Sequence, residues 1–475
     1  MTDRIPFKDS FNDNVSFLDS YMRVNENFDL VAREITIGSR PAKMYFVDGF
    51  AKDEILEKVM EFIMRIRDED LEPYKSTREF ANKFLPYIEV DVHSEVETFS
   101  TFIYAGAIGL IVDGYKGGIL IDARTYPVRS VEEPDNDRVL RGGREGFVET
   151  IIFNTALIRR KIRNRELTME IHQVGEKSKT DVVLSYLENK VDKRLLKRLQ
   201  KNLNEIKVNA LSMSQESLAE CLVKKQYFNP FPKVRYTERP DAAAACIYEG
   251  DIIVLVDGSP AAMIVPTSFF EFLQDTNDFY FPPIVGSYLR IVRAVIFGLA
   301  LLLTPVWYLL IQNPELIPQG LSFILIDEPY SITVFLQLMI IVLVVDALKL
   351  ASLNTPNSLS NSLSIIGALV LGELAVSAKL FSSEVVLFMA FVAIANFAQP
   401  SIELGYAFKL SRVFILVMTA LFNVVGFCVA LILTILMIAL TATISGKSYL
   451  YPLIPFKGKA LLSLFFRLPI NTDNN

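Results

Sequence analysis

Charged side chains are distributed very unevenly along this chain of 475 residues. Residues 291–445 contain 12 of them in 155 positions, whereas the other 320 positions contain 90. A helix that crosses the hydrocarbon core of a bilayer needs about 20 predominantly apolar residues. The apolar block therefore predicts an all-α polytopic membrane domain joined to a soluble region. It excludes a wholly soluble enzyme, a fibrous protein and a disordered chain.

The apolar block divides into several candidate membrane helices. These are residues 291–310, 331–350, 361–378, 384–398 and 413–445. The last run has 33 residues without a charge, which is about 50 Å of helix against a core of about 30 Å. Asn423 and Gly426 lie within this run as candidate kinks or breaks. The pattern predicts five or six helices and leaves the number open.

Basic residues predict the orientation of these helices. Residues 311–330 contain no Lys or Arg, whereas Arg290, Arg293, Lys349 and the tail lysines lie elsewhere. Because Lys and Arg are enriched in cytoplasmic loops, the N-terminal region and the tail are expected in the cytoplasm. Both ends on one side require an even number of crossings.

The polar half contains an internal repeat. The stretch IYAGAIGLIVDG at 103–114 recurs as IYEGDIIVLVDG at 247–258, an offset of 144 residues with most positions identical. In each copy, apolar runs flank an Asp-Gly turn signal, which predicts a strand hairpin. A strand and helices are expected ahead of each copy: 43–48 then 53–67, and 168–173 then 180–200. A tandem duplication explains this pattern.

These features divide the chain into six segments. An N-terminal extension (1–40) precedes the first α/β subdomain (41–128), a connector (129–164) and the second α/β subdomain (165–285). A transmembrane domain (286–446) and a C-terminal tail (447–475) follow. The expected fold class is an α/β cytoplasmic region of two related subdomains, followed by the all-α membrane domain.

Few residues of the polar half have the spacing of a chemical site. Asp113 and Asp257 of the repeat are either ligands of a cation or the first residues of Asp-Gly turns, and the turn is the commoner role. His93 and His172 are the only histidines, and neither belongs to a metal or nucleophile motif. With a net charge of −6, the pattern predicts no enzyme activity, no cofactor or metal and no nucleic-acid partner.

The connector between the subdomains is dense in charge and glycine. Its residues Arg141, Arg144, Glu145 and Glu149 predict a structured segment held by pairs of arginine and carboxylate. An anion cradle at 141–144 is the alternative, but the stretch lacks the GxxxxGK[ST] order of a P-loop.

Two blocks of sequence resemble the A subunits of the GerA-type spore germinant receptors. One is RGGREGFVE at 141–149 with NTALIRRKI at 154–162, and the other is LKLASLNTP at 348–356 with IIGALVLGE at 365–373. The resemblance covers about residues 30–456. Gly143, where typical A subunits have Pro, favours a sporulation paralogue within the family.

The resemblance implies a multi-pass protein of the spore inner membrane with a cytoplasmic α/β N-terminal region. It also implies a homo-oligomer in the lipid bilayer, pentamer-like, that conducts monovalent cations during germination. The partners that it implies are other spore membrane proteins of the germination machinery.

The third candidate helix has two distinct faces. Small residues that allow close helix packing recur on one face at Ser364, Ala368, Gly372 and Ala375. The neighbouring face carries Asn361, Ile365, Leu369 and Glu373. In a ring of identical subunits, this second face is expected to line a pore. Ile365 and Leu369 would then form a hydrophobic gate, and Glu373 an acidic ring that attracts cations.

The two ionisable residues at membrane depth have alternative roles. Glu373 either faces a pore, pairs with Lys379 or reaches water near the helix end, or relays protons. Asp346 lies three positions from Lys349 and is expected to form an interfacial pair with it.

The function predicted from these features is a cation-channel subunit of a spore germination complex. The alternatives are a secondary transporter, which discontinuous helices around 354–356 would favour, and a non-conducting scaffold of the receptor complex.

Overall fold

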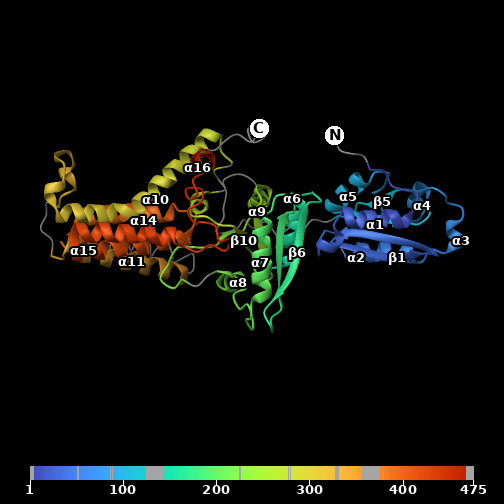
Figure 1. The fold of residues 1–475 in the computed structure, drawn as a ribbon, viewed down its shortest axis with the longest axis horizontal. Helices are drawn as coiled ribbons and strands as arrows, with labels where there is room; N and C mark the ends of the chain where they lie inside the picture. The colour runs from blue at the N-terminus through green and yellow to red at the C-terminus, as the bar shows by residue number, and fades with distance from the viewer. Residues whose placement is uncertain are drawn as a thin grey trace. The chain divides into compact units, whose positions relative to one another are not determined.

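The computed structural model describes residues 5–50, 53–85, 87, 89–124, 143–223, 226–275, 278, 280–326, 331–354, 375–377 and 379–466. The contacts divide the chain into two compact units. The N-terminal unit comprises residues 1–224 and 234–267, and the helical unit comprises residues 225–233 and 268–475. Figure 1 identifies the helices and strands of both units.

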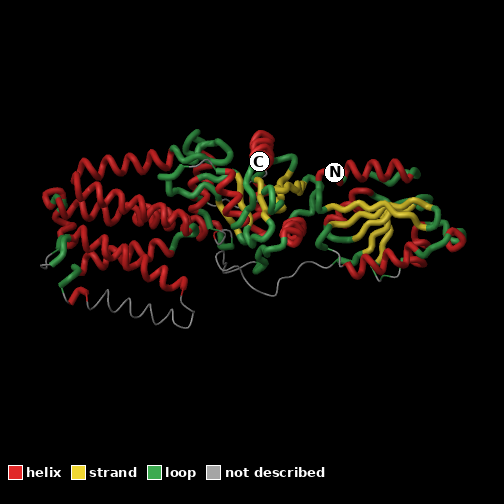
Figure 2. The backbone as a smooth tube through the Cα atoms, turned by 90° about the horizontal axis from the view of Figure 1, so that it is seen from below, coloured by secondary structure: helices red, strands yellow, loops and turns green. Residues whose placement is uncertain are grey.

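The first half of the N-terminal unit is a five-stranded antiparallel sheet with helices on both faces (Figure 2). Its strands, in spatial order, are β1 (Leu30–Ile37), β2 (Arg40–Val47), β4 (Ile108–Val112), β5 (Gly118–Ile121) and β3 (Val90–His93). Its helices are α1 (Phe11–Tyr21), α2 (Asp53–Met64), α3 (Asp68–Leu71), α4 (Thr77–Phe84) and α5 (Val96–Tyr104). Successive strand residues such as Leu110 and Ile111 enter different hydrophobic clusters, because side chains alternate between the two faces.

The second half repeats this architecture. Its sheet has the order β6 (Leu167–Val174), β7 (Thr180–Leu187), β9 (Ile252–Val256), β10 (Ala262–Val265) and β8 (Arg235–Thr237). Its helices are α6 (Ile151–Lys161), α7 (Lys193–Glu205), α8 (Ser214–Leu222) and α9 (Pro240–Glu249). The strand order matches that of the first sheet position by position, which confirms the predicted pair of related α/β subdomains.

The repeat is longer than the twelve matching residues indicate. Asn14 in α1 exchanges two hydrogen bonds with the backbone of Lys8, both 2.8 Å. Asn154 in α6 does the same with Val148, at 2.8 and 2.6 Å. Each half therefore begins with a segment clamped by a buried asparagine at the first turns of a helix. Strand β1 and α1 both precede residue 41, where the predicted first subdomain starts.

Two expectations about local structure were wrong in detail. The matching stretches at 103–114 and 247–258 begin inside α5 and α9, and only their later halves are strands. The expected helix at 180–200 is strand β7 followed by a turn and α7. Residues 182–187 are all buried, and a continuous apolar run on a fully covered strand has no period that distinguishes it from a helix.

The helical unit contains four long apolar helices. They are α10 (Pro283–Gln312), α11 (Val334–Asn354), α14 (Ser383–Phe397) and α15 (Ile402–Ala439). Within the described residues, α10, α11 and α15 are long and apolar enough to cross a membrane, and α14 is shorter. The short elements of this unit are η2 (Phe269–Leu273), η4 (Pro314–Leu316), η5 (Gln319–Ile324), α13 (Ala375–Ser377) and α16 (Gly458–Phe465). The short helix η1 (Val24–Glu26) belongs to the N-terminal unit.

Helix α15 is folded back on itself at Asn423. The backbone of Asn423 leaves the helical region (φ 51°, ψ −133°). A Cβ atom on Gly426 would lie 1.9 Å from the carbonyl oxygen of Met418, although eight residues of a straight helix span about 12 Å. Phe408 and Met437 pack in the same cluster, whereas Asn423 bonds to the distant end of α10. Helix α15 is therefore a hairpin with arms 402–422 and 424–439.

Contacts between the helices define two ends of this bundle. At the charged end, the ammonium of Lys349 in α11 lies 4.8 Å from the ring centre of Phe397 in α14 and 5.5 Å from that of Tyr406 in α15. At the far end, Asn313 and Asn423 exchange side-chain hydrogen bonds of 2.6 and 3.0 Å. Helix α11 thus ends at the charged end.

The next described residues after α11 lie at the far end. The backbone N–H of Ser331, just ahead of α11, donates to the carbonyl of Lys379 (3.3 Å). The N–H of Ser382 donates to Gln337 Oε1 (2.9 Å). The two described flanks of residues 355–374 are therefore at opposite ends of the bundle.

Candidate functional site

All four residues predicted to line a pore lie outside the described residues. This holds for Asn361, Ile365, Leu369 and Glu373, and for the small residues Ser364, Ala368 and Gly372. Ala375 begins the short helix α13. The intramembrane charge Asp346, in contrast, is described and lies within a cluster of charged side chains.

The charged cluster joins helices α11 and α15. Asp346 Oδ1 lies 2.6 Å from Lys409 Nζ, with the carboxylate one-third exposed and the ammonium mostly buried. The partner is thus on another helix, whereas Lys349, the neighbour expected from spacing, lies over two aromatic rings. Lys409 also lies 4.3 Å from the ring centre of Tyr406. A cation is attracted to the face of an aromatic ring, so these contacts stabilise both lysine side chains.

Arg412 completes the charged cluster on the side of α10. Its side chain is almost fully buried, and Nη1 donates to the carbonyl of Ala300 (2.8 Å). Arg412 lies one helical turn after Lys409, at the point where the uncharged run begins. Among the described residues, the cluster thus contains three cations and one carboxylate.

A second ionic site fixes the start of α10. Arg293 holds Asp278 with two bonds of 2.8 and 3.0 Å, and Arg290 Nε lies 3.4 Å from the same carboxylate. Asp278 is fully buried, so the pairing is what makes its burial tolerable. Sequence reasoning used the arginines only as orientation signals and expected Lys349 to pair with Asp346. The sequence signal that could have identified Lys409 and Arg412 as members of a charged cluster is their spacing of three residues immediately before an uncharged run.

The described part of the connector is bound to the second subdomain. Glu145 pairs with Arg160 (2.7 Å) and Lys161 (2.9 Å) of α6. The carbonyl of Glu149 accepts from the N–H of Gly258 (2.8 Å), and Arg144 is exposed. Arg141 lies outside the described residues. Of the four predicted connector residues, Glu145 thus binds α6 through its side chain, and Glu149 binds the second subdomain through its backbone.

The aspartates of the repeat stand in turns of matching geometry. Gly114 and Gly258, which follow them, have φ of +79° and +78°, a conformation that favours glycine. Asp257 Oδ1 accepts from the N–H of Ile151 at the start of α6 (3.2 Å), where a negative charge is favourable. Among the described residues, no group of three or more His, Cys, Asp or Glu has an arrangement that could hold a metal ion.

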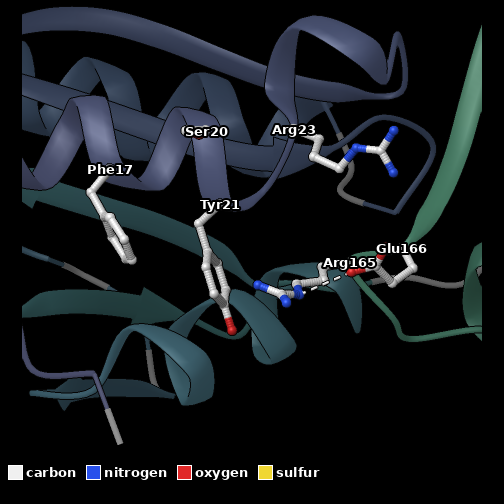
Figure 3. A pocket seen from close by; sticks show the side chains of 6 residues that line it. All are labelled: Phe17, Ser20, Tyr21, Arg23, Arg165 and Glu166. Atoms are coloured by element: carbon white, nitrogen blue, oxygen red, sulfur yellow. Dashed lines mark ion pairs between the residues drawn. The ribbon is translucent and has the colours of Figure 1, made fainter. Parts of the chain in front are cut away.

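A pocket of about 340 Å³ opens within the N-terminal unit (Figure 3). It is lined by Phe17, Ser20, Tyr21, Arg23, Arg165 and Glu166. The guanidinium of Arg165 lies against the ring of Tyr21, 4.7 Å from its centre, and pairs with Glu166 at 3.2 Å. Arg165 and Glu166, whose ion pair is drawn in Figure 3, therefore have partners within the lining of the pocket.

The chain is similar to known proteins over nearly its whole length. The family model for the Bacillus/Clostridium GerA spore germination protein matches residues 19–475. Stage V sporulation protein AF of Bacillus subtilis (strain 168) is 35% identical over 457 residues, which cover 96% of this chain and 92% of that protein. Spore germination protein KA of the same organism is 27% identical over 455 residues, 94% of this chain and 82% of the relative.

One solved structure is also similar to part of the chain. It is the N-terminal domain of the A subunit of the Bacillus megaterium spore germinant receptor GerK3, with a TM-score of 0.40 and 22% sequence identity. The match covers 56% of this chain and 98% of that domain.

The matches extend through both units, so they include the apolar helices as well as the α/β subdomains. The resemblance predicted from the connector and the apolar block is confirmed, and the apolar helices identify a membrane protein. The chain belongs to the GerA family of Bacillus/Clostridium spore germination proteins.

Proposed function

We propose that this protein is a subunit of a spore germination complex, that identical copies form a ring, and that the ring conducts monovalent cations. One observation carries the proposal. The described flanks of residues 355–374 lie at opposite ends of the helical bundle. The sequence between these flanks includes Asn361, Ile365, Leu369 and Glu373, and these are the residues that we propose line the pore.

The surface of the bundle supports an assembly in lipid. Leu421, Val425 and Ile432 of α15 are each more than half exposed in a single copy of the chain. Large apolar surface of this extent is stable only against lipid or another protein. A homo-oligomer in the spore inner membrane, together with other membrane proteins of the germination machinery, would cover it.

The charge distribution supports a cytoplasmic charged end. Lys349, Lys409 and Arg412 lie at that end with Arg290 and Arg293, against Lys379 at the far end. The enrichment of Lys and Arg in cytoplasmic segments then puts the N-terminal unit in the cytoplasm.

The roles of the individual residues follow from the chemistry of channels. Leu369 and Ile365 form a narrow apolar constriction that closes by excluding water, and Glu373 forms a ring of carboxylates that concentrates cations. Cations then move down their gradient through the ring without a coupled ion.

The test is ion flux through the full-length protein in liposomes. Wild-type protein is expected to release potassium down its gradient and to migrate as an oligomer in detergent. Leu369→Ala is expected to increase the resting leak, because it widens the apolar constriction. Glu373→Gln is expected to reduce the preference for cations over chloride.

A matched control and the opposing outcomes complete the design. Glu315→Gln makes the same chemical change on an exposed side chain and should leave flux unchanged. A monomer without flux would refute the channel. Flux that requires a counter-ion in fixed ratio would indicate a transporter. Normal ion release by both pore variants in germinating spores would indicate a scaffold.

A further inference from the structure

A loop of the helical unit is bound to the end of helix α15. This clasp loop (226–233) follows α8 in sequence but packs with the helical unit. Asn229 Nδ2 donates to Thr441 Oγ1 (2.8 Å). Gln226 Nε2 donates to the carbonyl of Leu440 (3.2 Å). That carbonyl is among those that the end of a helix leaves without an internal partner, so the bonds fix the clasp loop at this level.

The other side of the clasp loop is anchored in the core. Phe231 is buried, and the hydroxyl of Tyr449 donates to the carbonyl of Pro232 (2.6 Å). Burial and the nearby carboxylates raise the pKa of Tyr449, so its hydroxyl stays a donor. Between the two anchors, Tyr227 and Phe228 are 87% and 96% exposed. Two adjacent aromatic side chains are thus presented to the surroundings by a fixed backbone.

These aromatic side chains lie at the level where α15 leaves the membrane. The second arm of α15 ends at Ala439, and Leu440, whose carbonyl the clasp loop binds, is 71% exposed. The aromatic pair therefore lies beside the exposed end of this arm. Tyrosine and other aromatic rings are enriched at the depth of the headgroups, where an apolar ring meets a wet surface.

The same end of the bundle has further exposed apolar side chains and lysines. Helix α16 is attached to α10 by the bond from Arg290 Nη1 to the carbonyl of Ser463 (2.8 Å). Its Leu462 is more than half exposed, and Lys457 and Lys459 are at its start. Apolar side chains beside lysines match the surface of a bilayer, where the acyl chains lie beneath anionic headgroups.

We propose that Tyr227 and Phe228 insert into the bilayer surface at the charged end, so that the clasp loop and α16 seat the protein on anionic headgroups. A two-fold contact with a second copy of the chain fits this surface less well, because the same lysines would then face one another. This proposal does not depend on the channel.

The test uses tryptophan fluorescence of the full-length protein in vesicles of phosphatidylglycerol and phosphatidylcholine. Phe228→Trp adds a second tryptophan to the buried Trp307, and the wild-type signal is subtracted. The added emission is expected to be lost with lipids brominated near the headgroup and to be protected from iodide in the water. Because Phe228 is exposed, the larger ring disturbs no packing.

Phe62→Trp is the matched control, since Phe62 is half exposed on α2 of the first subdomain. Its emission should be quenched by iodide and not by brominated lipid. The proposal is overturned if Trp at position 228 is quenched by iodide alone, which means that it stays in water. Protection from both quenchers also overturns it, because the side chain then packs against protein.

Discussion

Arg159 and Asp29 form the most deeply buried ion pair in the described part of the N-terminal unit. Both side chains are almost inaccessible, at 0% and 1% exposure. Arg159 Nε and Nη2 donate to the two carboxylate oxygens at 2.9 and 2.8 Å, and Nη2 also lies 3.1 Å from Asn27 Oδ1. Because α6 supplies the arginine and the segment before β1 supplies the carboxylate, the pair joins the two subdomains.

Arg159→Met should lower the free energy of unfolding of this unit by about 3–5 kcal/mol, because it leaves the Asp29 carboxylate buried and unpaired. Methionine fills much of the same volume, so the expected loss is electrostatic. With a urea dependence of about 3 kcal/mol/M, the unfolding midpoint should fall by between about 1 and 2 M. Pulse proteolysis of the full-length protein in detergent and increasing urea measures it.

Two further variants make the reasoning refutable. Arg165, half exposed and paired with Glu166, is the matched control, and Arg165→Met should cost no more than about 1 kcal/mol. Arg159→Met combined with Asp29→Leu should recover much of the loss, since no unpaired charge remains. Equal losses for the two arginine variants would show that the buried charge is not what matters.

Three other perturbations test separate parts of the structure. Gly426→Ala should destabilise the α15 hairpin by at least about 1–3 kcal/mol, because its Cβ meets the carbonyl of Met418; an unchanged melting temperature in detergent would contradict the hairpin. Asp346→Asn should lower the free energy of unfolding by about 1–2 kcal/mol, since the pair with Lys409 is only partly exposed. Asp346→Lys combined with Lys409→Asp should restore thermal stability if the ion pair is the cause. The contact with His172 (2.9 Å) lowers the pKa of the Glu170 carboxyl below its usual 4.5, so the stabilisation by this carboxylate is present above that pH and is lost as the pH falls below it. Glu170→Gln should weaken this acid dependence in urea titrations, and an identical pH profile would argue against it.

The α/β region could be predicted in outline but not in extent. The twelve-residue match identified the duplication because β4 and β9 are covered on both faces and so remain apolar. The rest of the repeat preserves geometry rather than residues. Asn14 and Asn154 make the same clamp in segments whose other residues have diverged. Aligning the sequences of the two halves does not detect a hydrogen-bond pattern that they share when most of the residues around it differ.

The charged cluster was only partly predictable for a related reason. The spacing of Asp346 and Lys349 indicated a pair on one helix, because neighbours at i and i+3 face the same side. In the structure, Lys409 from α15 reaches the carboxylate first, and Lys349 turns to aromatic rings. Which partner is nearest depends on how α11 packs against α15, and that is not encoded in the local spacing.

The sequence by itself determined that residues 291–445 belong in a membrane, that the polar half is duplicated, and which family the chain belongs to. The first is a property of local composition, because the free energy of transfer into lipid sums over neighbouring residues. The other two are patterns within the sequence itself. Only the tertiary structure decided that the uncharged run turns back at Asn423 and that the clasp loop joins the end of α15. Both depend on partners such as Asn313 that are distant along the chain, and the packing of helices selects them.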